Sequence, residues 1–248
     1  MKGSTYLWFI SMVATIGGLM FGFDMGIISG AIPFIQPYFG WNELQLGWGV
    51  SSILMGAIIG AFGTGSLTEK YGRRSLLITV ALFFAISCAG MALAKHQTFF
   101  IAFRLLGGLA VGSVSVLSPM YVAEIAPARS RGTLRTIYQL AITFGILVSY
   151  LVNYALHDVE NNWRWMFATG LIPSVVFFVG LIFIPESPRW LVKAGFKEKA
   201  RDVLARIGGT EFAASEVKEI EKSLEKAGPG GGIRTLFAAK YRKVIILG

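Results

Sequence analysis

Two ionisable side chains, Asp24 and Arg104, lie well inside long apolar stretches of the chain. A charge near the centre of a bilayer costs about 2.5–3.5 kcal/mol on insertion scales, so each side chain needs a partner or a water-filled cavity. An acid and a base on two helices could form a static ion pair that only holds the helices together. They could also form a proton switch, because a carboxylate in a low dielectric takes up a proton more readily. Arg104 does not readily lose its own proton, so it suits a gate for Asp24 rather than a carrier.

A third polar side chain, Gln139, lies early in the uncharged stretch of residues 136–156. An amide can both donate to and accept from a sugar hydroxyl, and it can equally form a hydrogen bond between two helices. Elsewhere, Asp, Glu and Ser occur without a nucleophile–base pair or a group of metal ligands at diagnostic spacing. We therefore expect neither an enzyme nor a metal site.

The elements that carry these side chains are those of a membrane protein. Apolar residues make up 54% of the 248 residues and charged residues only 15%, against roughly 25% charged residues in soluble domains. The charges are also uneven, because residues 1–184 hold 16 of them and residues 185–248 hold 21. An apolar body is thus followed by a polar tail. Much of the net charge of +9 lies in short loops between apolar runs, which argues against nucleic-acid binding.

Six apolar stretches are long enough to span a bilayer, which takes about 20 residues of helix. We predict transmembrane helices at about 5–33, 46–68, 75–95, 98–123, 132–156 and 164–185. The first stretch continues past an acidic residue and is too long for the core of a signal peptide. Pro33 is expected to end this helix, and residues 37–40 are expected to form a turn. The small-residue motifs Gly56-x-x-x-Gly60 and Gly108-x-x-x-Gly112 favour close helix packing, with partners that spacing does not identify.

Loop charges predict the orientation, because Lys and Arg are enriched on the cytoplasmic side of membrane proteins. One set of loops and ends holds 20 of the 23 basic residues, while the other holds only Lys95 and Arg164. The remaining basic residue is Arg104. We therefore expect a multi-pass integral protein of the plasma or inner membrane, with both ends of this chain in the cytoplasm.

The polar tail is expected to form amphipathic helices against the cytoplasmic ends of the bundle. Ser187 and Pro188 suit the cap and the first turn of a short helix, which Gly195 would end. Apolar residues at helical spacing then mark two further helices, separated by Gly208 and Gly209. Residues 240–248 have the pattern of the first turn of another apolar helix, as expected for the first part of a longer protein.

An ordered set of motifs runs from the first predicted helix to the tail. Its members are Gly22-Phe23-Asp24 with Ile28-Ser29-Gly30, the loop at residues 65–74 with the pattern G-x-x-x-[DE]-[RK]-x-G-R-R, Arg104-Leu105-Leu106-Gly107-Gly108, Pro119-x-Tyr121-x-x-Glu124-Ile125-Ala126-Pro127-x-x-x-Arg131-Gly132-x-Leu134, Gln139-Leu140, and P-E-S-P-R-W-L at residues 185–191. With this set, the chain resembles the sugar porters of the major facilitator superfamily over essentially its whole length.

The resemblance implies an all-α membrane protein. Six transmembrane helices would form one major-facilitator bundle with a 3+3 inverted repeat, followed by cytoplasmic amphipathic helices. Residues 1–185 would be the N-terminal bundle, 186–239 the intracellular helical segment and 240–248 the start of a seventh transmembrane helix. In such porters a second six-helix bundle is the partner, and the sugar binds between the two bundles as they rock.

The resemblance also implies roles for single residues. Carried over by position, Gln139 would contact the sugar, Phe21 would line its pocket, and Asp24 would be the proton-coupling carboxylate with Arg104 as its partner. Facilitative relatives generally lack an acid at the position of Asp24, which favours proton symport of a monosaccharide or polyol, with the proton as coupling ion and no cofactor. The alternatives are a facilitative carrier with a static Asp24, and a six-helix receptor or half-transporter that pairs with itself.

Seven charged residues match the cytoplasmic charge network of the family: Glu69, Arg73, Arg74, Glu124, Arg131, Glu186 and Arg189. The resemblance implies that they form a latch that stabilises the outward-open state and separates on rocking. Exposed ion pairs are each worth only about 0–1 kcal/mol, so a latch would need several of them together. The alternative is a solvated basic set that only orients the protein.

Overall fold

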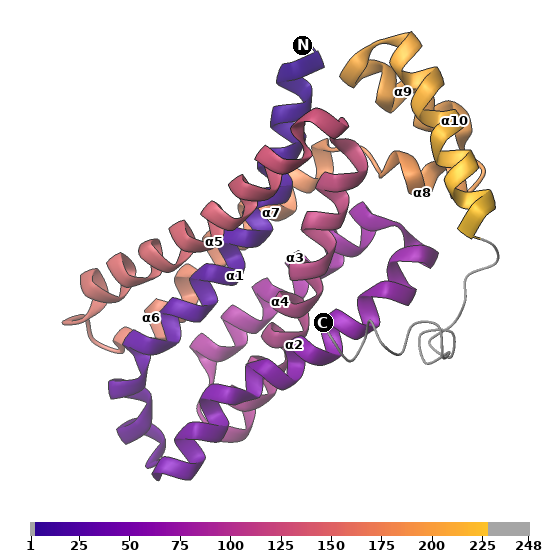
Figure 1. Ribbon diagram of the computed structural model, residues 1–248. Coiled ribbons are helices and arrows are strands. Elements are labelled where there is room, and N and C mark those ends of the chain that lie inside the picture. The colour runs from indigo at the N-terminus through magenta and orange to yellow at the C-terminus, as the bar shows by residue number, and fades with distance from the viewer. Residues whose placement is uncertain (1–2, 228–248) are drawn as a thin grey trace.

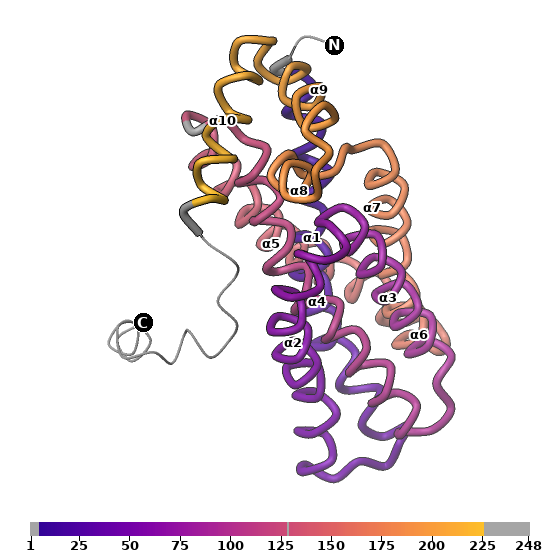
Figure 2. Tube along the Cα trace, turned by 90° about the vertical axis from the view of Figure 1, so that its right-hand side faces the viewer, coloured from indigo at the N-terminus to yellow at the C-terminus, as the bar shows by residue number. Residues whose placement is uncertain are grey.

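The computed structural model describes residues 3–227, and over this range the chain forms ten α-helices and no strand. A bundle is built from α1 (Gly3–Phe39), α2 (Glu43–Tyr71), α3 (Arg73–Leu93), α4 (Gln97–Ile125), α5 (Ala128–Leu156), α6 (Asn162–Thr169) and α7 (Leu171–Phe183) (Figure 1). Three further helices are α8 (Pro188–Lys193), α9 (Lys197–Gly208) and α10 (Thr210–Ala227). They lie at the end of the bundle where α1 begins (Figure 2). The predicted start of a seventh transmembrane helix at residues 240–248 lies outside the described residues.

All six predicted spans are confirmed as helices long and apolar enough to cross a membrane. The first is longer than predicted, because α1 continues through Pro33 and Pro37 to Phe39. The expected helix end at Pro33 and the expected turn at residues 37–40 were therefore wrong. Membrane helices tolerate proline because neighbouring groups satisfy the freed backbone carbonyls. The turn comes at Gly40, whose φ of +64° is a conformation that glycine adopts without steric cost.

The sixth span is interrupted at Gly170, where α6 ends and α7 begins. Pro173 has no N–H to donate to the carbonyl of Thr169, and its ring crowds that carbonyl, so the regular helix breaks one turn before the proline. The two helices together cover residues 162–183 and remain a single crossing.

Glycines bring α2 and α4 into direct backbone contact. A Cβ atom at Gly56 or Gly60 would collide with the backbone of α4, and one at Gly108 or Gly112 would collide with the backbone of α2. The two small-residue motifs found in the sequence are thus each other's partners. This close approach fixes the position of α4, the helix that carries Arg104.

Burial is uneven among the long helices. The membrane-spanning windows of α1 and α4 are the most buried, and those of α2 and α5 are the least buried. Asp24 and Arg104 therefore belong to the two helices at the centre of the bundle. Large apolar side chains such as Phe62 on α2 and Tyr154 on α5 are exposed, as expected for a surface covered by lipid or by further helices.

The three short helices follow the predicted pattern. The hydroxyl oxygen of Ser187 accepts a hydrogen bond from the N–H of Trp190 at 3.4 Å, and Pro188 is the first residue of α8. Gly195 and Gly209 have φ values of +86° and +89° and separate the three helices. Leu191, Val192 and Ala200 form a small core of their own, so the polar tail packs as a compact helical unit.

Candidate functional site

Asp24 of α1 and Arg104 of α4 meet inside the bundle. Nη1 of Arg104 lies 3.7 Å from Oδ1 of Asp24, and the two residues are only 1% and 2% exposed. This separation suits an attractive ion pair but is too long for a direct hydrogen bond. Nε and Nη1 of Arg104 are buried without a hydrogen-bond partner among the described residues. The two predicted partners are therefore together, with part of the guanidinium still available for another acceptor.

The pair borders a pocket of about 300 Å³ that is lined by residues of α1, α2 and α4. Phe21 lines this pocket one turn before Asp24. Ser51 of α2 adds a hydroxyl group, and the other lining residues are apolar, with Leu54 and Val111 among them. An apolar lining of this kind lowers the local dielectric, which strengthens the attraction between the two charged groups.

Gln139 lies apart from this pocket, on α5. Its side chain is exposed, and its amide has no hydrogen-bond partner within residues 3–227. The alternative role as an interhelical hydrogen bond is thus not seen. The amide is instead available on the outer surface of the bundle, on one of its two least buried helices.

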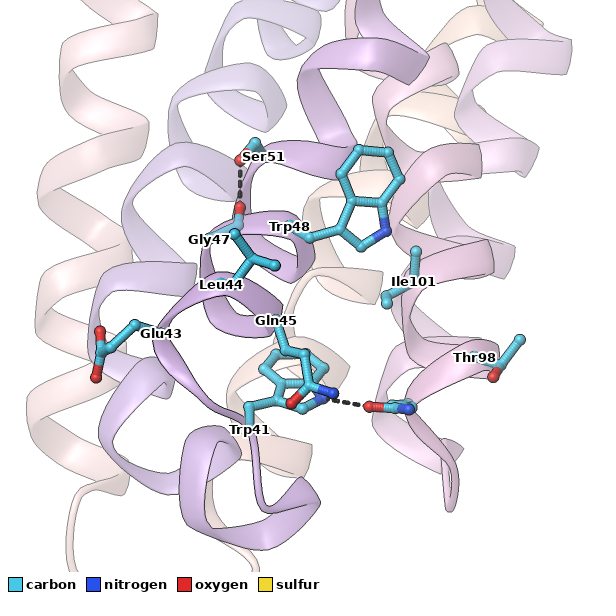
Figure 3. A pocket seen from close by; sticks show the side chains of 10 residues that line it. Trp41, Glu43, Leu44, Gln45, Gly47, Trp48, Ser51, Thr98 and Ile101 are labelled. Carbon is cyan, nitrogen blue, oxygen red and sulfur yellow. Dashed lines mark hydrogen bonds between the residues drawn. The ribbon is translucent and has the colours of Figure 1, made fainter.

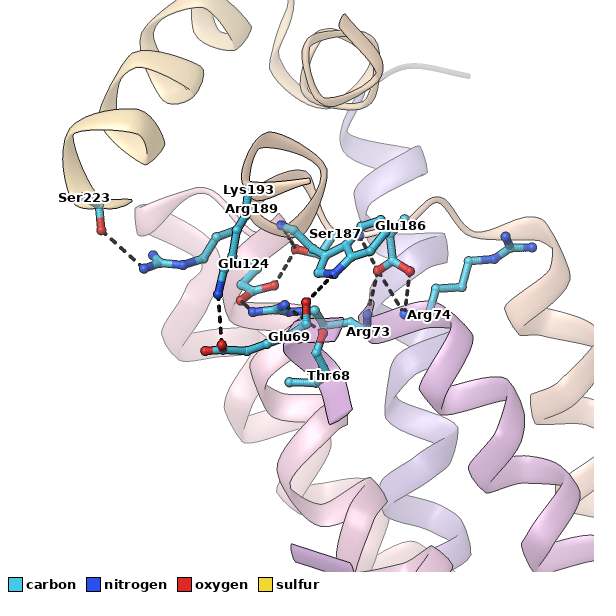
Figure 4. Close-up of polar contacts among 11 residues, drawn as sticks. Thr68, Glu69, Arg73, Arg74, Glu124, Glu186, Ser187, Arg189, Lys193 and Ser223 are labelled. Carbon is cyan, nitrogen blue, oxygen red and sulfur yellow. Dashed lines mark hydrogen bonds and ion pairs between the residues drawn. The ribbon is translucent and has the colours of Figure 1, made fainter. Parts of the chain in front are cut away.

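At the opposite part of the molecule, beside α8, Arg73 and Glu124 form a shielded ion pair. Nη2 of Arg73 lies 2.8 Å from Oε1 of Glu124, and the two side chains are only 8% and 11% exposed. The second carboxylate oxygen of Glu124 accepts a hydrogen bond from the hydroxyl of Ser187. The start of α3, the end of α4 and the start of α8 are joined in this way (Figure 4).

Glu186 binds the N-terminal end of α3. Its Oε1 accepts hydrogen bonds from the backbone N–H groups of Arg73 at 2.8 Å and of Arg74 at 3.0 Å. Arg74 in turn donates from Nε to the carbonyl of Leu181 at 2.8 Å and from Nη2 to that of Ile182 at 2.9 Å. An acid thus lies at a helix N-terminus and a base at a helix C-terminus, and both complement the helix dipoles.

The three remaining members of the predicted network make separate contacts. Glu69 pairs with Lys193 at 2.9 Å, Nε of Arg131 donates to the carbonyl of Ala126 at 2.9 Å, and Nη2 of Arg189 donates to Ser223 at 3.3 Å. All seven predicted residues lie at the same end of the bundle. Within the described part of the chain they form several local contacts and not one continuous chain of ion pairs.

Sequence reasoning missed two residues of this region. Ser187 was expected only as a helix cap, and its bond to Glu124 follows from the tertiary position of α8. Tyr121 of α4 donates its hydroxyl to the carbonyl of Pro185 at 2.6 Å, at the junction between α7 and α8. The sequence signal for this second contact is the position of the tyrosine, two residues after Pro119 in the motif that begins with that proline.

Comparisons with known proteins agree on one family. Residues 10–248 match the family model described as Sugar (and other) transporter. The chain is 41% identical to the arabinose-proton symporter of Bacillus subtilis (strain 168), over 96% of this chain and 53% of the relative. It is 38% identical to the D-xylose-proton symporter of Escherichia coli (strain K12), over 99% of this chain and 56% of the relative.

Solved structures give the same result. The proton:xylose symporter XylE bound to 6-bromo-6-deoxy-D-glucose matches with a TM-score of 0.89 at 37% identity, covering 95% of this chain and 56% of that one. A partially occluded inward-open structure of XylE from E. coli matches with a TM-score of 0.87. The chain spans about half the length of the curated relatives it matches.

Proposed function

Because this chain belongs to the Sugar (and other) transporter family, we propose that it is part of a carrier that moves a monosaccharide or polyol together with protons by alternating access. The chain is a multi-pass membrane protein, and within residues 3–227 six helices are long and apolar enough to span a membrane. The observation that carries the proposal is the buried Asp24–Arg104 pair beside a pocket. The names of the relatives, which include arabinose-proton and D-xylose-proton symporters, support both the substrate class and the coupling ion.

Proton coupling follows from the position of the pair. When Asp24 is ionised, it neutralises Arg104, which is almost fully buried. Protonation of Asp24 removes that compensation and leaves the guanidinium in need of other acceptors, because a buried charge without a partner is strongly unfavourable. The protonation state of Asp24 therefore changes which relative arrangement of α1 and α4 is the more stable. No cofactor is needed for this cycle, since the proton itself is the coupling ion.

The substrate site combines Gln139 and Phe21 with a second bundle. The amide of Gln139 can donate to and accept from sugar hydroxyls. Phe21 can pack its ring against the apolar C–H face of a sugar from its position in the pocket. The exposed apolar surfaces of α2 and α5 suit the lipid bilayer and a second six-helix bundle.

The end of the bundle that carries α8–α10 is the cytoplasmic end in this proposal, in the plasma or inner membrane. Among the described residues it carries Lys70, Arg73 and Arg74, the basic residues at the start of α5, and those of α8–α10, as the positive-inside rule predicts. The contacts of Glu124 and Glu186 hold α3, α4, α7 and α8 together there. We assign these contacts to a latch, and we expect them to break when the two bundles rock.

The test is sugar-driven proton uptake by the complete protein in liposomes. Asp24→Asn should abolish sugar accumulation driven by a pH gradient and should retain sugar counterflow, which needs no net proton movement. Glu43→Gln, at an exposed acid at the start of α2, is the matched control and should retain both activities. If Asp24→Asn still accumulates sugar, the coupling role is wrong. If the unsubstituted protein shows counterflow but no accumulation, the protein is a facilitative carrier with a static Asp24.

A further inference from the structure

The two ends of α2 are secured by different parts of the chain. At the end away from α8–α10 the cap is local, because Oδ1 of Asn42 accepts from the N–H of Gln45 at 2.9 Å and Oε1 of Gln45 accepts from the N–H of Asn42 at 3.0 Å. Just before this turn, Nε1 of Trp41 donates to Oε1 of Gln97 of α4 at 2.8 Å, beside a pocket of about 810 Å³ (Figure 3). At the other end of α2, residues of the tail supply the contacts.

Within residues 3–227, the last turn of α2 leaves the carbonyl of Glu69 without a main-chain donor. In a continuous helix this carbonyl would accept from the N–H of Arg73, four positions later. The chain instead turns at Gly72, where φ is +90°, and the N–H of Arg73 donates to Oε1 of Glu186 at 2.8 Å. Nε1 of Trp190 takes the place of that N–H and donates to the carbonyl of Glu69 at 3.0 Å.

Glu69 is also held through its side chain. Nζ of Lys193 lies 2.9 Å from Oε2 of Glu69, and Lys193 follows Trp190 by three positions on α8, so both side chains reach from one face of that helix (Figure 4). An acid in the last turn of a helix opposes the helix dipole, and the pairing with Lys193 offsets this cost. We call the contacts of Trp190 and Lys193 with Glu69 the α8–α2 contact.

The α8–α2 contact differs in exposure from the pair of Arg73 and Glu124. The side chains of Glu69 and Lys193 are exposed, and the bond from Trp190 is also at the surface. Exposed contacts lose little free energy when they open, because water replaces both partners. The pair of Arg73 and Glu124 is shielded from water, so breaking it costs more. Of these contacts beside α8, the α8–α2 contact therefore opens more readily.

α2 connects this contact with the pocket beside Asp24. Ser51 and Ala57 of α2 line that pocket. The helix is unbroken from there to Glu69, so a movement of its end is carried along a rigid element toward the pocket. Trp190 itself lines neither of the two pockets along α2, so its effect on them goes through the helix.

We propose that Trp190 is a further positioning residue of the transport cycle. Its indole N–H holds the end of α2 to the tail while the cytoplasmic side is closed, and the α8–α2 contact opens before the shielded contacts of Glu124 separate. The inference rests on the proposed function, because it takes the contacts beside α8 as a latch that opens during transport.

The test is hydrogen–deuterium exchange of the purified full-length protein, followed in the peptide that contains the amides of residues 72–74. These amides are bonded to Thr68 and Glu186, so they exchange only when the junction between α2 and α3 opens. Trp190→Phe removes the N–H donor and keeps an apolar ring for the core of the tail, against which Trp190 packs. It should speed this exchange about threefold to tenfold, as expected for the loss of one hydrogen bond.

Two further variants define the effect. Trp8→Phe, the same substitution at an exposed tryptophan of α1, is the matched control and should leave the exchange of residues 72–74 unchanged. Lys193→Met removes the side-chain part of the α8–α2 contact and should speed the exchange in the same direction by a smaller factor.

Transport separates a positioning role from a purely structural one. Sugar counterflow by Trp190→Phe should keep its KM, because Trp190 lines neither pocket along α2, and its maximal rate should rise because the latch opens more easily. A role in folding alone would lower both the maximal rate and the unfolding temperature.

A saturating mixture of D-xylose, arabinose and glucose links the contact to the transport cycle. In the unsubstituted protein the mixture should speed the exchange of residues 72–74, and in Trp190→Phe its added effect should be smaller. Unchanged exchange in Trp190→Phe overturns the inference, and so does equal acceleration throughout the protein. If the sugar mixture alters exchange nowhere in the unsubstituted protein, the proposed function itself fails.

Discussion

Glu186 accepts a hydrogen bond from the backbone N–H of Arg73 at 2.8 Å, although 113 positions separate the two residues in the chain. The same carboxylate binds the N–H of Arg74, so one acid satisfies two donors at the start of α3. A charge-assisted bond of this kind fixes the segment after α7 against the bundle. It also gives α8 a defined starting point next to α3 and α4.

We expect Glu186→Ala to lower the free energy of unfolding of the full-length protein by about 1–3 kcal/mol, the usual range for a lost hydrogen bond to a charged group. Glu186→Gln keeps one acceptor oxygen and should cost less. Thermal unfolding in detergent measures both changes. Glu211→Ala, at an exposed acid in the first turn of α10, is the control and should cost only a few tenths of a kcal/mol. Equal costs at the two positions would contradict a special role for Glu186.

The ion pair of Arg73 and Glu124 should be strongly coupled, because both side chains are shielded from water. A double-mutant cycle with Arg73→Met and Glu124→Gln should give a coupling energy of about 1–3 kcal/mol. The pair of Lys193 and Glu69 has a similar distance of 2.9 Å but side chains that are 43% and 58% exposed. Its coupling energy should be about 0–1 kcal/mol. Similar coupling energies for the two pairs would contradict the expectation that shielding from water strengthens the pair of Arg73 and Glu124.

The contact of α2 with α4 should be sensitive to a single methyl group. Gly108→Ala would drive a Cβ atom into the backbone carbonyl of Ile53, and we expect a loss of about 1–3 kcal/mol in the free energy of unfolding. Gly63→Ala is the matched control on α2, because a Cβ atom there meets nothing within 4 Å. Chemical unfolding of both variants measures the difference. A neutral Gly108→Ala variant would show that the helices can separate without cost.

The sequence predicted the features that the bilayer itself enforces. Hydropathy identified the six spans, because a helix that is surrounded by lipid must carry mostly apolar side chains along its length. The cost of isolated charge in lipid likewise required a partner for Asp24, and Arg104 was the other ionisable residue deep inside a span. In the structure the two side chains are indeed paired, at 3.7 Å.

Features that depend on tertiary packing were not accessible in the same way. Local rules end a helix at Pro33, yet α1 continues to Phe39, whose ring packs against those of Trp41, Phe100 and Trp163. Spacing revealed the glycine motifs of α2 and α4 but not that they face each other. The bonds of Arg74 to the carbonyls of α7 join residues more than a hundred positions apart, so no local pattern predicts them.

The role of Gln139 in sugar binding can be separated from any role in stability, because its side chain is exposed and its amide has no partner within residues 3–227. Gln139→Ala should weaken sugar binding by the full-length protein about threefold to tenfold, as expected for the loss of one or two neutral hydrogen bonds. Its unfolding temperature should not change. Isothermal titration with sugar measures the first effect and thermal unfolding the second. Thr136→Ala, one turn earlier on α5 and also exposed, should bind sugar normally. An exposed amide without protein partners can affect sugar affinity only through direct contact with the sugar. Normal sugar affinity in Gln139→Ala would therefore exclude this residue from the substrate site.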